Sequence, residues 1–488
     1  MRKIRGVILL LAVALSIVSI QAQDNHYSWM QYGSRNSILY NAGLSRFEDQ
    51  SAVIMNPATL ADALQSSFNF NTNVVSFNKI KFEDGLGKGF TVKNDNLNVL
   101  PSMASGVWKP KNEQKKWTLG YALYHANTDV LDFSDRSERR EDLLVETEGP
   151  GDEYYLAQYN LENKMDEFTT VIGLGWKLSE NWSFGASQSF TYRNQDYREA
   201  FSAFVITDPA LNAPVDLVGS NQDYTVKYST LMTHTKLGLQ YKGKKWDLGF
   251  TVSSPTFRIF GTGKILADLS LTNVRLSPIQ TVPRSNFLAN GQIEDLKAKY
   301  KYPLNASLGA SRQFGNLRLY GAVQWYGAID RYSVVDPGDA SFIQPPSANN
   351  VLYTSQVLSV WSSNKSVING SVAADWLLKS GNHFLLSFRT DNHYAEFDKN
   401  IDGNNLAVKQ WDNYHLTIGT QREMKSSVWV VGVRFNYGVN KEFPQPASFK
   451  DPSEGNFLQG DRQTGKITST GIQLMLSYTF KFGNKAGN

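Results

Sequence analysis

The strongest constraint on the fold is a strict two-residue alternation of apolar and polar side chains over unusually long segments. Residues 471–482 place apolar or aromatic side chains at every second position: Ile472, Leu474, Leu476, Tyr478, Phe480 and Phe482. Residues 427–440 repeat the pattern with Trp429, Val431, Val433, Phe435, Tyr437 and Val439. A period of two indicates β-strands, and about 12 residues is well beyond the usual five or six. Strands of this length match the tilted span of a membrane β-barrel.

The same pattern over the whole chain predicts 14 strands whose connections alternate between short and long. The expected strands lie near 67–78, 99–109, 116–128, 167–178, 181–193, 230–242, 245–256, 301–313, 316–329, 366–379, 382–393, 411–423, 427–440 and 467–482. The long connections lie near 79–98, 129–166, 194–229, 257–300, 330–365, 394–410 and 441–466. An even number of antiparallel strands with tight turns at one end and long loops at the other is typical of outer-membrane barrels. A β-sandwich has shorter strands and no such alternation of loop length.

We therefore predict an all-β fold, a 14-stranded antiparallel transmembrane β-barrel over residues 67–482, with a short C-terminal tail at 483–488. Lipid offers no hydrogen-bond partners, so only a closed sheet satisfies the strand backbones. Arg389 and Arg434 fall at inward positions of their strands. A charge on the lipid-facing side would cost about 2–4 kcal/mol, so both are expected to point into the lumen.

The first 22 residues predict an export signal. A basic start is followed by an apolar run from Val7 to Ile20 and by Ala22 at a plausible cleavage site, which is typical of a secretory signal peptide. The run is shorter than the roughly 20 residues of a spanning helix, although an uncleaved anchor is the alternative. We expect the protein in the outer membrane of a Gram-negative bacterium, in contact with its lipids.

Charge and composition exclude several function classes. Without the three basic residues near the start, 46 basic and 45 acidic residues nearly balance, so no nucleic-acid partner is expected. The chain has no cysteine, which excludes disulfides and thiolate chemistry. No HExxH or GxSxG motif is present, so we expect no enzyme and no cofactor.

Residues 23–66 do not alternate, and they predict a plug in the lumen. The stretch is too long for a simple tail and too polar for a wall strand, and its apolar residues need shelter. A disordered periplasmic tail is the alternative. Asn56 followed by Pro57 predicts the start of a short helix, because Asn is a favoured N-cap and proline suits the first helical position.

These residues carry a resemblance to a known family. Asn56-Pro57-Ala58, with Leu60-Ala61 after it and Asp49-Gln50-Ser51-Ala52 before it, resembles the hatch signature of the FadL/TodX family of outer-membrane hydrophobic-compound transporters. Weaker likenesses follow at 172–185, 248–263 and 302–309. The resemblance implies a 14-stranded barrel closed by a hatch over 23–66 that includes Asp49, Asn56, Pro57, Ala58 and Leu60. It implies passive, hatch-gated uptake of hydrophobic or long-chain fatty-acid-like molecules, with lateral exit through a kinked strand.

An amphipathic ligand would need both apolar and charged contacts in the lumen. The expected lining residues are Lys236, Tyr320, Tyr326, Arg389 and Arg434. A buried carboxylate needs a cationic partner, and Lys236, Arg389 or Arg434 would supply it. The alternative is that these cations pair with hatch acids such as Glu48 or Asp49.

One stretch favours a different function. Residues 132–167 carry 12 acidic residues against four basic ones, unlike an apolar loop that collects ligand. Such a charge run is usually a solvated face, but it also suits docking to a partner. The alternative function is therefore a non-transporting barrel that acts as a scaffold or adaptor for other outer-membrane or periplasmic proteins in a secretion or assembly complex.

A partial calcium loop is the one metal candidate. Asp398, Asn400 and Asp402, with Gly403 after them, copy the first half of a calcium-binding loop. Lys409 occupies the position of the bidentate glutamate, and Asp-Gly runs are also common in turns, so an ordinary outer turn is the alternative.

Overall fold

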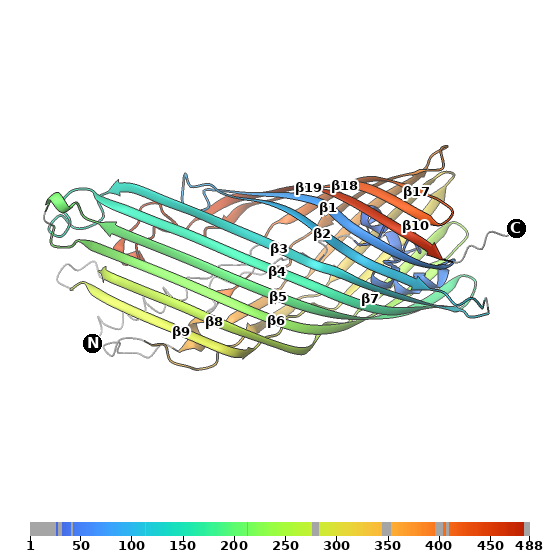
Figure 1. The fold of residues 1–488 in the computed structure, drawn as a ribbon, viewed down its shortest axis with the longest axis horizontal. Helices are drawn as coiled ribbons and strands as arrows, with labels where there is room; N and C mark the ends of the chain where they lie inside the picture. The colour runs from blue at the N-terminus through green and yellow to red at the C-terminus, as the bar shows by residue number, and fades with distance from the viewer. Residues whose placement is uncertain are drawn as a thin grey trace.

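The computed structural model is a closed antiparallel β-barrel with 14 strands around its wall (Figure 1). It describes residues 26–27, 32–40, 42–112, 114–211, 213–275, 283–343, 353–395, 404–406 and 409–482. The predicted signal peptide (1–22), the C-terminal tail (483–488) and the calcium-loop residues Asp398, Asn400 and Asp402 lie outside these ranges. Among the described residues, no helix is long and apolar enough to cross a membrane.

The wall strands follow one another in chain order, and the last pairs with the first to close the ring. They are β1 (Ser66–Glu83), β2 (Val92–Trp108), β3 (Trp117–Glu141), β4 (Glu153–Lys177), β5 (Trp182–Ile206), β6 (Leu217–Lys242), β7 (Trp246–Ser253), β10 (Asn305–Phe314), β11 (Leu317–Tyr326), β14 (Val367–Leu377), β15 (His383–Asp391), β17 (Asp412–Glu423), β18 (Ser427–Pro444) and β19 (Thr464–Phe482). Each corresponds to one of the 14 predicted segments.

The remaining elements are not part of the ring of wall strands. The further strands are β8 (Phe257–Val274), β9 (Ser285–Lys297), β12 (Ile329–Val335), β13 (Val360–Asn364) and β16 (Asn404–Asn405). The short helices are α2 (Asn36–Leu39), η1 (Ala42–Leu44), α3 (Ala52–Met55), η2 (Pro57–Asp62), η3 (Pro209–Leu211), α4 (Thr354–Val357) and η4 (Glu454–Asn456). We call the end of the barrel with the short turns the inner end, and the opposite end the outer end.

Four of the seven predicted long loops, at 79–98, 129–166, 194–229 and 257–300, are largely strands, which corrects the sequence prediction. Residues 129–166 are not a loop, because β3 continues to Glu141 and β4 begins at Glu153. The ladders β3–β4, β4–β5, β5–β6, β6–β8 and β8–β9 continue in the same way, so six neighbouring strands form an extension beyond the barrel (Figure 1). We call it the outer sheet.

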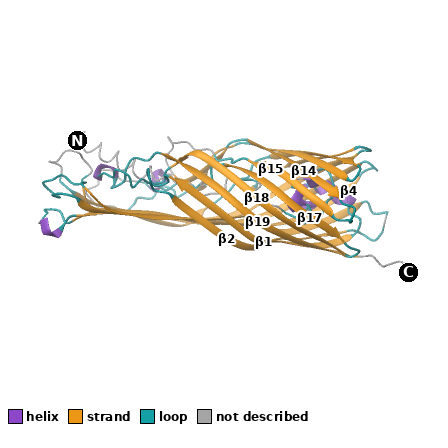
Figure 2. Cartoon of the chain, turned by 90° about the horizontal axis from the view of Figure 1, so that it is seen from above, coloured by secondary structure: helices purple, strands orange, loops and turns teal. Residues whose placement is uncertain are grey.

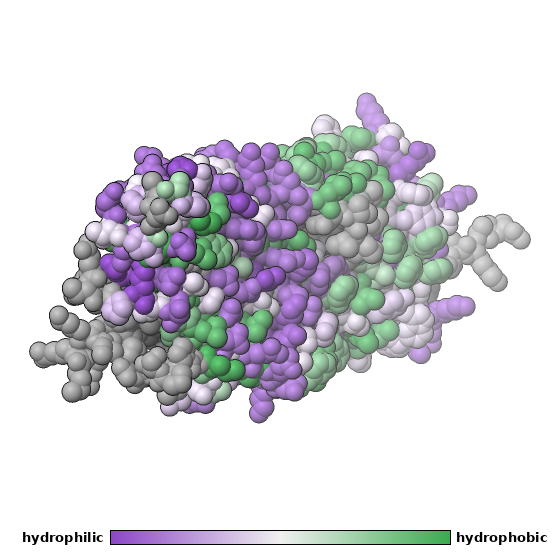
Figure 3. All heavy atoms as spheres, turned by 60° about the vertical axis from the view of Figure 1, so that its left-hand side comes forward, coloured by the Kyte–Doolittle hydropathy of each residue, from purple (hydrophilic) through white to green (hydrophobic). Residues whose placement is uncertain are grey.

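The two faces of these long strands exchange polarity along their length. Near the inner end of β4, the outward side chains are apolar and exposed, as at Phe168 and Ile172. Farther out, the outward positions carry charges such as Glu162 and Lys164, and the inward Tyr155 is fully buried. Figure 3, with the outer end forward, shows a hydrophilic surface around this end and a hydrophobic belt farther back. The reversal marks the point at which the wall leaves the lipid.

The inward face of the outer sheet supports an apolar core like that of a soluble protein. The core includes Leu131, Phe133, Tyr155, Tyr159, Phe201, Val226, Ile265, Val335, Phe449 and Leu458. Residues 445–463, between β18 and β19, supply part of it, and the hydroxyl of Tyr155 donates to the carbonyl of Leu458 at 2.8 Å. Arg284 pairs with Glu454 of this connection and with Glu148 of the connection between β3 and β4, each at 2.6 Å. It therefore holds the two connections together. Loops therefore cover the inward face at the outer end (Figure 2).

One wall strand is interrupted. β7 pairs with the inner part of β6 up to Ser253, and β8 pairs with its outer part from Phe257 onward. On the other side, β7 pairs with β10 and β8 pairs with β9, so residues 254–256 and 298–304 fall between the two ladders. Pro255 lacks the N–H that a continuous ladder requires. We call this break in the wall the seam.

Candidate functional site

The N-terminal segment (the described part of residues 32–63) lies inside the inner end of the barrel. Its short helices occupy the space enclosed by the strands in two views (Figures 1 and 2), and most of its residues are buried. Two wall glycines allow its close approach, since a side chain at Gly185 would overlap the Pro57 carbonyl and one at Gly249 would overlap the Leu44 carbonyl.

The residues of the predicted hatch signature hold this segment together. The side chain of Asn56 caps η2 by accepting a hydrogen bond from the Ala58 amide at 3.1 Å, as the sequence predicts. Its amide nitrogen donates to the carbonyls of Leu44 at 2.7 Å and Leu239 at 3.2 Å, and the second bond reaches the wall. Asp49 accepts from the backbone amides of Asn36 and Ser51, each at 2.8 Å. Pro57, Ala58 and Leu60 are buried against wall strands.

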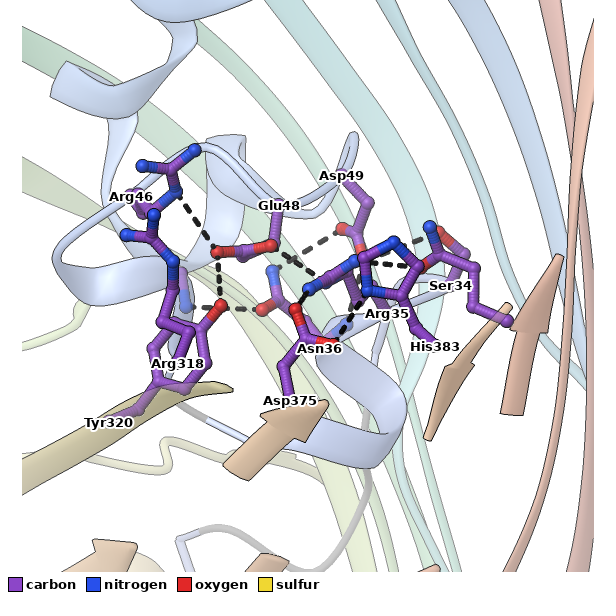
Figure 4. A network of polar contacts seen from close by, with 12 residues as sticks. Ser34, Arg35, Asn36, Arg46, Glu48, Asp49, Arg318, Tyr320, Asp375 and His383 are labelled. Atoms are coloured by element: carbon purple, nitrogen blue, oxygen red, sulfur yellow. Dashed lines mark hydrogen bonds and ion pairs between the residues drawn. The ribbon is translucent and has the colours of Figure 1, made fainter. Parts of the chain in front are cut away.

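A network of charged residues joins the N-terminal segment to four wall strands (Figure 4). Glu48 lies 2.8 Å from Arg35 and 3.5 Å from Arg46, and the hydroxyl of Tyr320 donates to it at 2.9 Å. Beyond these contacts, Arg35 pairs with Asp375, which also bonds His383, while Arg46 and Arg318 both pair with Asp247. The network connects β7, β11, β14 and β15, and it anchors the segment to one side of the barrel.

A cavity of about 180 Å³ lies between the N-terminal segment and the wall. It is bounded by Ile54 and Met55 of that segment and by Ser253, Ser254 and Tyr302 at the seam. Its other lining residues are His26, Tyr27, Tyr32, Tyr40, Tyr124, Ala126, Asn127, Glu167, Thr169, Thr191, His234, Lys236, Pro303, Asn305, Gln324 and Tyr326. The cavity thus connects the segment to the break in the wall.

Tyrosine rings dominate the lining. Six of the lining residues are tyrosines. The ring of Tyr27 stacks on that of Tyr326 with centroids 4.2 Å apart, and it meets Tyr302 edge-on at 5.9 Å. Tyr32 lies against Tyr124 at 4.5 Å, and its hydroxyl donates to the carbonyl of Ala126. The cavity therefore presents flat apolar faces with hydroxyl groups at their edges.

Two side chains that line the cavity, Glu167 and Lys236, carry a charge, and only that of Glu167 is paired with an opposite charge among the described residues. Glu167 pairs with the buried Arg193 at 2.6 Å, and the Tyr302 hydroxyl donates its one hydrogen to the carboxylate, 2.7 and 2.8 Å from its two oxygens. Lys236 donates from Nζ to the carbonyl of Ile54 at 2.5 Å. In the described part of the chain, no carboxylate lies within 4 Å of that ammonium group.

The predicted lumenal residues separate into two groups. Lys236 and Tyr326 line the cavity, while Tyr320 belongs to the charged network through Glu48. Arg389 and Arg434 point inward and are buried, but they do not line the cavity, and the guanidinium of Arg389 lies 4.0 Å from the ring centre of the lining residue Tyr40. The alternative pairing of these cations with hatch acids is wrong, because Glu48 contacts Arg35, Arg46 and Tyr320, while Asp49 bonds within its own segment.

Sequence reasoning missed most of the cavity. Tyr27, Tyr32 and Tyr40 lie in the segment predicted as a plug, with no repeat to single them out, and Tyr302 lies within the irregular stretch 298–304. His234 and Glu167 stand at inward positions of β6 and β4, and Glu167 was assigned to an acidic run. The one sequence signal that could have indicated these two residues was their inward position on a strand, and many residues that do not line the cavity share it.

Comparison with known proteins gives a consistent fold assignment. No family model and no curated protein sequence matches the chain. Among solved structures, a TodX monoaromatic hydrocarbon channel mutant superposes with a TM-score of 0.56 at 14% identity, covering 93% of this chain and 100% of that one. The chain has the FadL/TodX-type fold. The Pseudomonas putida toluene transporter TodX gives 0.55 at 13% identity, with 93% and 99% covered. A Pseudomonas aeruginosa FadL homologue gives 0.52 at 15% identity, with 93% and 100% covered.

Proposed function

We propose that this protein is an outer-membrane channel through which hydrophobic or amphipathic small molecules diffuse passively, with the N-terminal segment acting as a hatch. One observation carries the proposal: the cavity is bounded on one side by that segment and on another by the seam. A molecule in the cavity is therefore in contact with both parts that would have to move. The fold shared with hydrocarbon channels supports the same function.

The arrangement of the lumen supports a gated path. The N-terminal segment fills the inner end, and the apolar core of the outer sheet covers the outer end. Because both ends are occupied, passage requires a movement of the segment, of the loops or of the wall. The N-terminal segment is attached to the wall by hydrogen bonds, by ion pairs and by two apolar clusters around Leu60 and Ile38, so its movement would have to break these contacts.

The seam is the proposed site of lateral exit. Its two edges are joined by a few contacts, such as the Thr256 amide donating to the Tyr302 carbonyl at 3.1 Å. Arg258 of β8 adds a bond to the carbonyl of Ala298 at 2.7 Å. The side chains of Phe257 and Phe260 next to it are exposed on the outward side, 63% and 51% respectively. An apolar molecule leaving here would enter a lipid environment.

Uptake into vesicles tests the proposal. Proteoliposomes containing the protein should take up labelled toluene or a long-chain fatty acid faster than vesicles without it. Equal rates with and without the protein would contradict channel function.

A tether between segment and wall tests the hatch separately. The chain has no cysteine, so Asp62→Cys with Lys242→Cys gives a clean pair at a site where the two side chains lie 3.2 Å apart. Joining the two thiols with a short bismaleimide should reduce uptake, and the unlinked double variant is the control. Unchanged uptake after complete cross-linking would contradict a hatch role for the segment.

A further inference from the structure

The size of the cavity restricts the ligand. An engineered protein cavity of about 150 Å³ holds one benzene molecule. The cavity of about 180 Å³ therefore holds a single ring with a small substituent. A long acyl chain would have to extend out of it. This inference rests on the proposed channel function and narrows its substrate class.

The shape and chemistry of the lining favour an aromatic ring. Tyr27 and Tyr326 already stack on each other, and Tyr32 packs against Tyr124, so the lining consists of ring faces from several directions. Offset and edge-on packing of aromatic rings adds about 0.5–1.5 kcal/mol per pair beyond the area that is buried. An aliphatic molecule of the same volume would not gain this term.

The charge in the cavity favours an anion. Glu167 is neutralised by Arg193, and its oxygens also accept from Tyr302. Lys236 contacts the Ile54 carbonyl, which leaves the positive charge of the ammonium group uncompensated by any carboxylate of the described residues. A cation away from water is costly unless an anion pairs with it. The bond to Ile54 fixes the position of the ammonium group beside the rings.

We propose that the cavity binds a monocyclic aromatic carboxylate, with its ring among the tyrosines and its carboxylate on Lys236. The alternative role for Lys236 is attachment of the N-terminal segment alone. The two roles differ in a measurable way, because attachment affects every ligand, whereas charge pairing affects anions and leaves neutral rings unchanged.

Binding measurements on the purified full-length protein in detergent test the proposal. The probes are benzoate, toluene and a long-chain fatty acid. We expect Lys236→Met to weaken benzoate binding at least tenfold and to leave toluene binding within about twofold, while Lys236→Arg keeps the preference for benzoate. Migration of unheated samples in gels confirms that each variant is folded.

Lys242→Met is the matched control. Lys242 lies on the same strand and also contacts the N-terminal segment, through Asp62 at 3.2 Å, but it does not line the cavity. Lys242→Met should bind benzoate like the unaltered protein. An equal loss in both Met variants, equal losses for toluene and benzoate in Lys236→Met, or fatty-acid binding tighter than benzoate binding would overturn the proposal. These results leave channel function intact, whereas absence of uptake for all three probes would refute the channel itself.

Discussion

At the scale of single residues, the same side chain often joins two parts of the molecule that are distant in sequence. Asn56 caps η2 within the N-terminal segment and donates to Leu239 of the wall. Removing it should therefore loosen both the helix and its attachment.

Asn56→Ala should destabilise the N-terminal segment by about 1–2 kcal/mol, because an N-cap is lost and two carbonyls lose a donor. Hydrogen exchange of the amides of residues 58–62 should become faster, while exchange in the wall strands stays unchanged. Asn56→Asp keeps the acceptor for the Ala58 amide and should show an intermediate effect. Unaltered exchange in the alanine variant would contradict a structural role for this cap.

Glu199 gives the outer sheet a dependence on pH. It lies on β5 beyond the lipid-facing region, where the Tyr197 hydroxyl donates to it at 2.9 Å. Burial raises the pKa of Glu199 to about 7, although the nearby Arg462 acts in the opposite direction. Between the ordinary carboxyl pKa and about 7, the folded state binds more protons than the unfolded state. The stability of the outer sheet should thus fall as pH rises through this window and stay level above it.

Glu199→Gln should remove this dependence. The measurement is hydrogen exchange of residues 155–161 at pH 5 and pH 8, corrected for intrinsic rates. Glu162→Gln, an exposed carboxylate on the outward face of β4, should leave the dependence in place. A pH dependence that persists in Glu199→Gln would assign it to another group.

At the scale of elements, the sequence predicted which strand residues face inward. It could not predict how far along the barrel axis each of them lies. The period of two is a local property, so it correctly placed Lys236, Tyr320 and Arg389 on inward faces. Whether two inward residues meet depends on the register between strands far apart in sequence. For this reason Lys236 and Tyr326 line the cavity, while Tyr320, Arg389 and Arg434 lie elsewhere.

The outer sheet was missed for a related physical reason. A strand outside the lipid has no need of an apolar outward face, so charges such as those at 162 and 164 interrupt the pattern that identifies the membrane strands. The acidic run at 132–167 therefore looked like a loop. Several of its acids pair with neighbours on the same face, for example Glu138 with Arg136 and Glu162 with Lys164. This accounts for the charge run without an external partner.

The seam allows a test of the exit route at the element scale. A disulfide across it, from Thr256→Cys with Tyr302→Cys, should hold the two edges together and reduce the release of an apolar ligand into the bilayer. Reduction of the disulfide should restore the rate. The matched pair Thr251→Cys with Ser307→Cys lies in the continuous β7–β10 ladder and should have no effect on the rate. Equal rates for the oxidised and reduced seam variant would place the exit elsewhere.

At the scale of the whole molecule, the same β-sheet carries its apolar side chains on opposite faces in its two halves. In lipid, the apolar side chains face outward and the lumen contains polar groups and the N-terminal segment. Beyond the lipid, the same strands turn their apolar side chains inward and build a core under the connection 445–463 and under residues 332–343, which include the end of β12. The change occurs along β3 to β6, where the β4–β5 and β5–β6 ladders are unbroken and the β3–β4 ladder shifts its register only between His125 and Asn127, so the strands stay paired while the solvent changes.

The position of this change can be measured by adding one charge at two heights of the same strand face. Ile172 on β4 is outward and 53% exposed within the apolar belt. A lysine there should cost about 2–4 kcal/mol at the centre of a bilayer. Asn160, also outward on β4, lies beyond the reversal and pairs with the uncharged Ser134 and Ala200, so Asn160→Lys should change the free energy of folding by less than about 0.5 kcal/mol. Urea titrations of refolding into vesicles would give both values. Similar costs at the two positions would show that the lipid extends past the reversal, and the outer sheet would then have to be placed in the membrane.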